Sequence, residues 1–198
     1  EKARLREATQ ARGEAPFLGP VERAMRRFGE PARLRAEGLD LRERFAELGL
    51  APKQQGRRPS CAVFAVVGAL EYQLAEATGR PEQLSEEYLI WATRTTLGLG
   101  PGEPRVIGDA GQGADDDDRD AGFTLGEVLA ALRVYGVPLR REMPNTFGKG
   151  MEAIGSPPEA LIGSARQRSG VFVHVVPGAG QADKVANIVH LLNEGVPV

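Results

Sequence analysis

The pattern of hydrophobic positions predicts one strongly apolar helix that begins at Cys61. Apolar residues stand at positions 63, 64, 66, 67, 70 and 74. This helix is therefore hydrophobic nearly all round, which is typical of a helix in the centre of a core. Gly79 and Pro81 are expected to end it, because both residues disfavour the interior of a helix.

Two further helices have clear start signals. Ser85 is expected to cap the helix of "LSEEYLIWATR", whose positively polarised first turn contains two glutamates. Thr124 and Glu127 form a capping box in front of another apolar face, and Gly136 is expected to terminate that helix. Both helices are thus predicted with defined ends.

The C-terminal part of the sequence predicts helices that alternate with strands. Helices are expected in residues 157–168 and in residues 182–195, where positions 185, 188, 189 and 192 form an apolar face. Residues 170–176, "GVFVHVV", predict a strand, and "VPV" at residues 196–198 predicts the start of another. The pattern therefore favours an α+β protein.

Two segments lack a strong hydrophobic pattern. Residues 1–38 predict charged helical pieces broken by Pro16, Pro20 and Pro31, and we expect an N-terminal helical extension or an arm similar to a pro-segment. Residues 97–122 form a long loop rich in glycine and aspartate, and loops of this length are usually functional or disordered. The main domain is expected to comprise residues 39–198.

Composition and charge restrict the possible partners. The chain has 198 residues and a net charge of −2, which gives no reason to expect nucleic acid or an anionic membrane. No apolar run approaches the roughly 20 residues that a membrane helix needs. A single cysteine excludes an internal disulfide and favours a cytoplasmic location, although removal of an export signal would leave the same sequence.

The setting of that single cysteine favours a nucleophile. Cys61 stands at the first turn of the apolar helix, where unpaired N–H groups and the helix dipole favour the thiolate. Gln55 and Gly56 precede it in a polar loop. A glutamine amide and the Cys61 N–H would give two donors to the oxyanion of a tetrahedral acyl intermediate. The competing interpretation is a small apolar core residue, which a lone cysteine often is.

Five stretches of the chain, in order, resemble the papain-like cysteine peptidases. "QGRRPSCAVFA" at residues 55–65 resembles the family's Gln-Gly, four residues, Cys, two residues and Phe. The other stretches are "DLR" at 40–42, "QLSEEYL" at 83–89, "DAGFTLGEVLAALRVYGV" at 120–137 and "LLNEGVPV" at 191–198. The resemblance spans residues 40–198 and is greatest to bacterial members that lack disulfides.

The resemblance implies a papain-like α+β fold, with a helical lobe that carries the cysteine and the start of a β-barrel-like lobe. It implies that Cys61 is the nucleophile and that Gln55 stabilises the oxyanion. Gly122 would pair with an extended peptide, with Ala121 in place of the family's preceding glycine and Phe123 as a wall of the S2 pocket. The implied activity is that of an endopeptidase that acts on peptides or proteins through an acyl enzyme, without a cofactor or a metal.

The general base of the family has no counterpart in this sequence. In the family, the catalytic His and the Asn that orients it follow the strand that "VPV" resembles, so we expect a C-terminal segment or a second chain to supply them. His190 is expected to be a solvated helix residue and His174 a partly buried strand residue, and neither is expected to be catalytic. The family's disulfide beside the nucleophile is also absent, and Arg58 stands near one of its positions.

Other interpretations remain open at this point. The same resemblance fits an inactive papain-like domain that acts as a binding or regulatory module, and it fits a transferase that uses Cys–His chemistry. The acidic stretch "GADDDDRD" at residues 113–120 is expected to be a solvated loop. Binding of Ca²⁺ and a preference for basic substrates are the alternatives for that loop.

Overall fold

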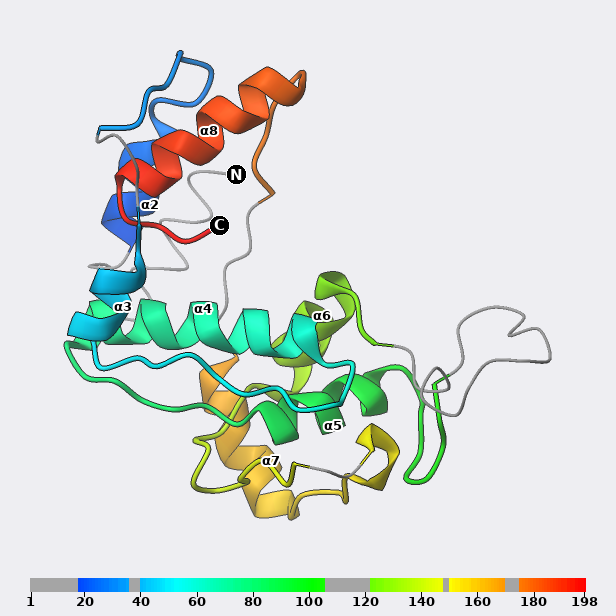
Figure 1. Cartoon of the computed structure of the whole chain (residues 1–198). Helices are drawn as coiled ribbons and strands as arrows, with labels where there is room; N and C mark the ends of the chain where they lie inside the picture. Colours follow the sequence, from blue (N-terminus) through cyan, green and yellow to red (C-terminus); the bar gives the residue numbers. More distant parts are fainter. Residues whose placement is uncertain (1–17, 36–39, 106–121, 148–149, 170–174) are drawn as a thin grey trace. The chain divides into compact units, whose positions relative to one another are not determined.

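The computed structural model describes residues 18–35, 40–105, 122–147, 150–169 and 175–198 of the chain (Figure 1). These residues form α-helices, short 3₁₀ helices and irregular segments. The chain divides into two compact units, the first comprising residues 1–50, 72–80 and 173–198 and the second residues 51–71 and 81–172. Helix α4, Cys61–Thr78, contributes residues to both units.

The first unit contains α2 (Leu18–Met25), α3 (Arg42–Glu47) and α8 (Gln181–Asn193). Helices α2 and α8 lie side by side (Figure 1). The small core between them consists of Ala24, Leu191 and Val196, with Val21, Phe28 and Val176 packed against it. Pro20 does not break α2 as the sequence suggested, because it lies in the first turn, where no N–H partner is needed.

The buried face of α8 differs from the predicted one. Asn187, His190 and Leu191 are buried, whereas Val185 on the predicted apolar face is 52% exposed. Asn187 accepts a hydrogen bond from the Gly29 N–H over 3.1 Å and donates one to the Pro177 carbonyl over 2.7 Å. Polar residues are buried here because the irregular segments packed on α8 have backbone groups that need partners.

The second unit contains α5 (Glu86–Thr96), α6 (Leu125–Tyr135), η2 (Met151–Ala153), α7 (Glu159–Ala165) and η3 (Arg166–Arg168), together with residues 61–71 of α4. Helices α5 and α6 pack against each other. The centre of the Trp91 ring lies 5.2 Å from the ring centre of Tyr88 and 5.3 Å from that of Tyr135. The Tyr88 hydroxyl donates to the Tyr135 carbonyl over 3.1 Å, which joins the two helices.

The predicted helix ends in this unit are confirmed. The Ser85 side chain accepts from the Tyr88 N–H, and Thr124 and Glu127 form the reciprocal capping box. Gly136 ends α6 with φ of 68°, a conformation that favours glycine. Its α-carbon also faces the Ala165 carbonyl so closely that no side chain would fit.

The expected fold class is wrong for the described residues. We expected an α+β papain-like fold with the start of a β-barrel-like lobe, but these residues are helical and include no β-strand. Residues 170–174 of the first predicted strand lie outside the described residues. Residues 196–198 take no part in a strand, because a strand forms only where a neighbour pairs with its backbone groups. The antiparallel bridge Leu84–Leu139 is the only β-type pairing that the described residues show.

Helix α4 buries one face rather than its whole surface. Val63 and Val67 are fully buried, whereas Cys61 and Ala65 are exposed. By length and composition alone α4 could also cross a membrane. This is weak evidence, because core helices meet the same criteria.

Candidate functional site

Cys61 is the first residue of α4, and its side chain is exposed. The carbonyl of the preceding Ser60 accepts hydrogen bonds from the N–H groups of Val63 and Phe64 over 3.0 and 3.1 Å. The helical hydrogen bonds therefore begin next to the thiol, at the end of the helix where N–H groups have no partner within the helix. A reagent or a substrate carbonyl in solution can reach this thiol.

Gln55 lies in the loop before α4 and is half buried. Its Nε2 donates to the carbonyl of Arg58 over 2.6 Å, and the Ser60 N–H donates to the same carbonyl over 2.8 Å. Gly56 has φ of 77°, which lets the chain turn directly after Gln55. The loop thus holds the Gln55 amide on the backbone that leads into α4.

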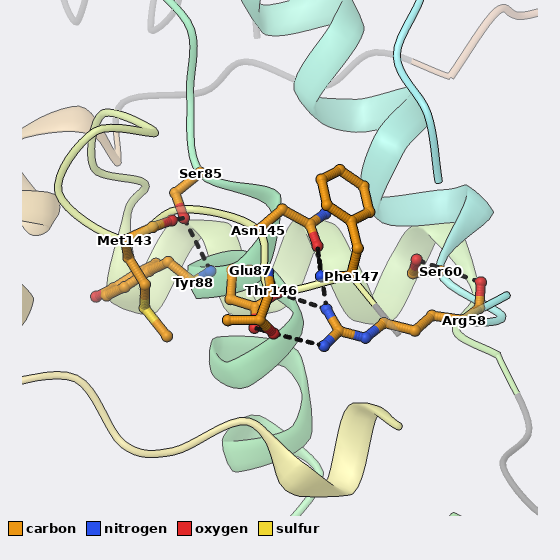
Figure 2. Close-up of polar contacts among 9 residues, drawn as sticks. All are labelled: Arg58, Ser60, Ser85, Glu87, Tyr88, Met143, Asn145, Thr146 and Phe147. Carbon is orange, nitrogen blue, oxygen red and sulfur yellow. Dashed lines mark hydrogen bonds and ion pairs between the residues drawn. The ribbon is translucent and has the colours of Figure 1, made fainter. Parts of the chain in front are cut away.

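The Arg58 side chain is buried in a polar network, which Figure 2 shows. Its guanidinium forms an ion pair with Glu87 of α5 and donates from Nη2 to the Thr146 hydroxyl over 2.8 Å. A longer bond of 3.3 Å joins Nη1 to Asn145 Oδ1. The network connects the loop before Cys61 to α5 and to residues 145–146 (Figure 2).

Lys53 anchors the other end of the same loop. Its ammonium group bridges the carboxylates of Glu71 on α4 and Glu86 on α5, both of which are buried. Glu71 also accepts from the Leu84 N–H over 2.6 Å. Burial raises the pKa of Glu71, against the lowering effects of Lys53 and of the Leu84 N–H. Two carboxylates therefore share one cation beside the loop of Gln55.

Gly122 lies against the loop that precedes Cys61. A Cβ at residue 122 would be 2.6 Å from the carbonyl oxygen of Pro59, so only glycine fits without a shift of the backbone. The Gly122 carbonyl accepts from Arg105 Nη1 over 2.8 Å. Phe123 is only 7% exposed, and the Arg105 guanidinium lies 5.5 Å from the centre of its ring. Ala121 lies outside the described residues.

Arg105 also fixes the start of α6. It forms two bonds to the Glu127 carboxylate, of 2.7 and 3.0 Å, while Glu127 accepts from the Thr124 N–H in the capping box. The Arg105 hydrogen bond is the main cause that lowers the pKa of Glu127, and the Thr124 N–H adds to it. Arg105 therefore connects the Gly122 carbonyl to the capped start of α6.

Of the two histidines, only His190 lies among the described residues. His190, expected to be solvated, is 2% exposed, and its Nε2 contacts the Glu30 carbonyl at 3.1 Å. Its Nδ1 has no hydrogen-bond partner among the described residues. His174 and the acidic stretch 113–120 lie outside the described residues. In that described part no three metal-binding side chains come together.

A cavity of about 320 Å³ lies elsewhere in the second unit. Trp91, Thr95, Leu99, Ile154 and Ser156 line it, and none of the predicted site residues does. Arg94 forms part of its wall and donates to the Gly100 carbonyl over 3.1 Å. The cavity therefore gives no support to the site that the sequence predicted.

The structure brings the loop of Gln55, the thiol of Cys61 and the backbone of Gly122 into one unit. It adds Lys53, Glu87 and Arg105, which the sequence did not identify as parts of the site. Two features of the sequence could have indicated Lys53 and Glu87: the basic residues Lys53 and Arg58 stand on either side of Gln55, and two adjacent glutamates stand at a helix start.

Comparisons with protein-family models, curated proteins and solved structures found no match for this chain.

Proposed function

We propose that this protein is a cysteine peptidase of the papain-like type, with Cys61 as its nucleophile. The observation that carries the proposal is the contact between Gly122 and Pro59. It brings Gly122, which the resemblance matches to the family's peptide-binding glycine, to a point two residues from the proposed nucleophile. These segments are more than 60 residues apart in the sequence, so the contact is a property of the folded chain.

In the proposed reaction the Cys61 thiolate attacks the carbonyl carbon of a peptide bond. The oxyanion that forms accepts hydrogen bonds from the Gln55 amide and the Cys61 N–H. The tetrahedral intermediate then expels the amine, which takes a proton from a histidine, and leaves a thioester on Cys61. Water, deprotonated by the same histidine, hydrolyses the thioester and restores the thiol.

The peptide substrate would lie along Gly122. The Gly122 carbonyl already accepts from Arg105, but a carbonyl oxygen has two lone pairs and can accept a second donor from an extended peptide. Phe123 is buried under Arg105, so it would shape a pocket wall as a fixed group. The proposal assigns the histidine and its asparagine partner to a C-terminal segment or a second chain.

Reaction with a peptidyl epoxide tests the proposal, because such epoxides alkylate activated cysteines. The intact protein should gain one inhibitor mass, and Cys61→Ala should gain none. Iodoacetamide serves as the control for exposure alone. A thiol that reacts with iodoacetamide but not with the epoxide, in a protein that cleaves no peptide library, would disprove the peptidase.

A second candidate function is a binding or regulatory module with an inactive papain-like site. It is favoured by the burial of His190, which leaves no exposed histidine among the described residues. This candidate predicts that peptides bind without being cleaved and that Cys61→Ala binds them as tightly as the natural protein. Titration calorimetry on both proteins separates the two functions.

A further inference from the structure

We infer that Arg58 is a positioning residue that holds the Gln55 amide at the start of α4. The inference rests on the proposed function for the role that it gives to Gln55. Arg58 acts through both of its ends: its carbonyl accepts from Gln55, and its guanidinium is fixed in the interior of the second unit.

The carbonyl end fixes the orientation of the glutamine side chain. Gln55 Nε2 lies 2.6 Å from the Arg58 oxygen, and the Ser60 N–H donates to that oxygen over 2.8 Å. One oxygen therefore joins the proposed oxyanion donor to the residue that precedes Cys61. A glutamine amide has two N–H groups, so the second one remains to donate to an oxyanion.

The guanidinium end fixes the position of that carbonyl. Arg58 is 5% exposed, and its planar group contacts Glu87 and Thr146 with different nitrogens (Figure 2). The Thr146 hydroxyl in turn donates to Glu87, and the Thr146 N–H donates to the same carboxylate over 3.3 Å. Every member of this buried group thus has a partner, which makes the arrangement rigid.

Arg58→Lys is the most informative change. Lysine keeps the charge but lacks the planar fork that contacts Glu87 and Thr146 together. We expect the loop to shift and the Gln55 amide to leave its place, with a loss in kcat of about tenfold to a hundredfold and little change in KM. Tyr88→Phe is the matched control, because it removes another buried hydrogen bond of the same unit, to the Tyr135 carbonyl.

Two measurements on the intact protein test the inference. The first follows the side-chain N–H resonances of Gln55 by NMR, which should move in Arg58→Lys and stay in place in Tyr88→Phe. The second is a double-mutant cycle in kcat with Gln55→Ala. If Arg58 acts through Gln55, Arg58→Lys should cost less than about twofold once Gln55 is already alanine.

The outcomes separate the inference from the proposed function. Unmoved Gln55 resonances in Arg58→Lys overturn the inference, whether or not the protein cleaves peptides. Equal losses of kcat in the two backgrounds also overturn it, and leave the peptidase intact. Absence of any turnover or epoxide adduct in the natural protein overturns the peptidase, while the NMR result still decides whether Arg58 holds Gln55.

Discussion

The backbone of Gly122 packs directly on the carbonyl oxygen of Pro59. A Cβ at residue 122 would lie 2.6 Å from that oxygen, closer than real Cβ contacts allow. The neighbouring atoms are the backbone carbonyl and the ring Cβ of Pro59 rather than a flexible side chain, so the strain of a larger residue cannot be relieved by a rotamer change. The position of the loop before Cys61 therefore depends on the absence of a side chain at residue 122.

Gly122→Ala should destabilise the protein and displace the loop. We expect the free energy of unfolding to fall by about 1–3 kcal/mol, the usual cost of overpacking a tight contact. Peptide cleavage, if the proposed function holds, should fall with it. Gly163→Ala is the control, because this helical glycine has nothing within 4 Å of an added Cβ. It should stabilise by about 0.5–1 kcal/mol. Equal results in urea unfolding for the two variants would contradict the contact.

We expect loss of the Lys53 cation to destabilise the protein more than loss of the Glu71 carboxylate that it contacts. Lys53→Met should destabilise by about 3 kcal/mol, because it leaves two buried carboxylates without their cation. Glu71→Gln should cost less than about 1 kcal/mol, because the amide oxygen can still accept from the Leu84 N–H while Lys53 keeps Glu86. Urea unfolding at neutral pH measures both variants, and the reverse order would disprove the shared cation.

The same cluster should make stability depend on pH in a defined direction. The pKa of Glu71 is raised above its ordinary value of 4.5, mainly by burial. The folded protein therefore binds this proton more tightly than the unfolded chain. Its free energy of unfolding should fall as the pH rises from 4.5 through the folded pKa. Glu71→Gln should remove this fall. A wild-type pH profile that matches that of Glu71→Gln in this range would contradict the raised pKa.

Glu127 should show the opposite dependence. Its pKa is lowered from 4.5, first by the Arg105 hydrogen bond. Its contribution to stability is therefore present above pH 4.5 and is lost as the pH falls through the folded pKa. In Arg105→Met the pKa of Glu127 should move up towards 4.5, which an NMR titration of the side-chain carboxyl carbon would detect. An unchanged titration would show that Arg105 does not hold this carboxylate.

The helix ends could be predicted because their signals are local. Ser85, Thr124 with Glu127, and Gly136 act on backbone groups within four residues, so the sequence around each of them contains the full cause. The β-type lobe was predicted from signals that are not local, and it is wrong for the described residues. Residues such as 196–198 form a strand only with a distant partner, and an alternation of apolar residues does not show whether that partner is present.

The hydrophobic pattern could not predict the buried charged residues for a related reason. Lys53 and Arg58 look like solvated loop residues, and Glu86 and Glu87 look like ordinary first-turn acids. Arg58, Glu86 and Glu87 are buried and Lys53 is partly buried only because each charge meets a partner about 30 residues away. His190 was misplaced likewise, since hydrophobic periodicity cannot reveal that the Glu30 carbonyl lies over that face of α8.

His190 should support the fold of the first unit and play no part in catalysis. His190→Gln removes a buried ring that contacts the Glu30 carbonyl, so we expect a loss of about 1–3 kcal/mol in the free energy of unfolding. Peptide cleavage by the fraction that remains folded should change by less than about twofold, whereas loss of a general base costs on the order of a hundredfold or more. Turnover should be measured at a temperature where unfolding curves show the variant to be folded. A loss of kcat of the larger size, with the fold intact, would instead make His190 the base, and the proposed C-terminal segment or second chain would then be unnecessary.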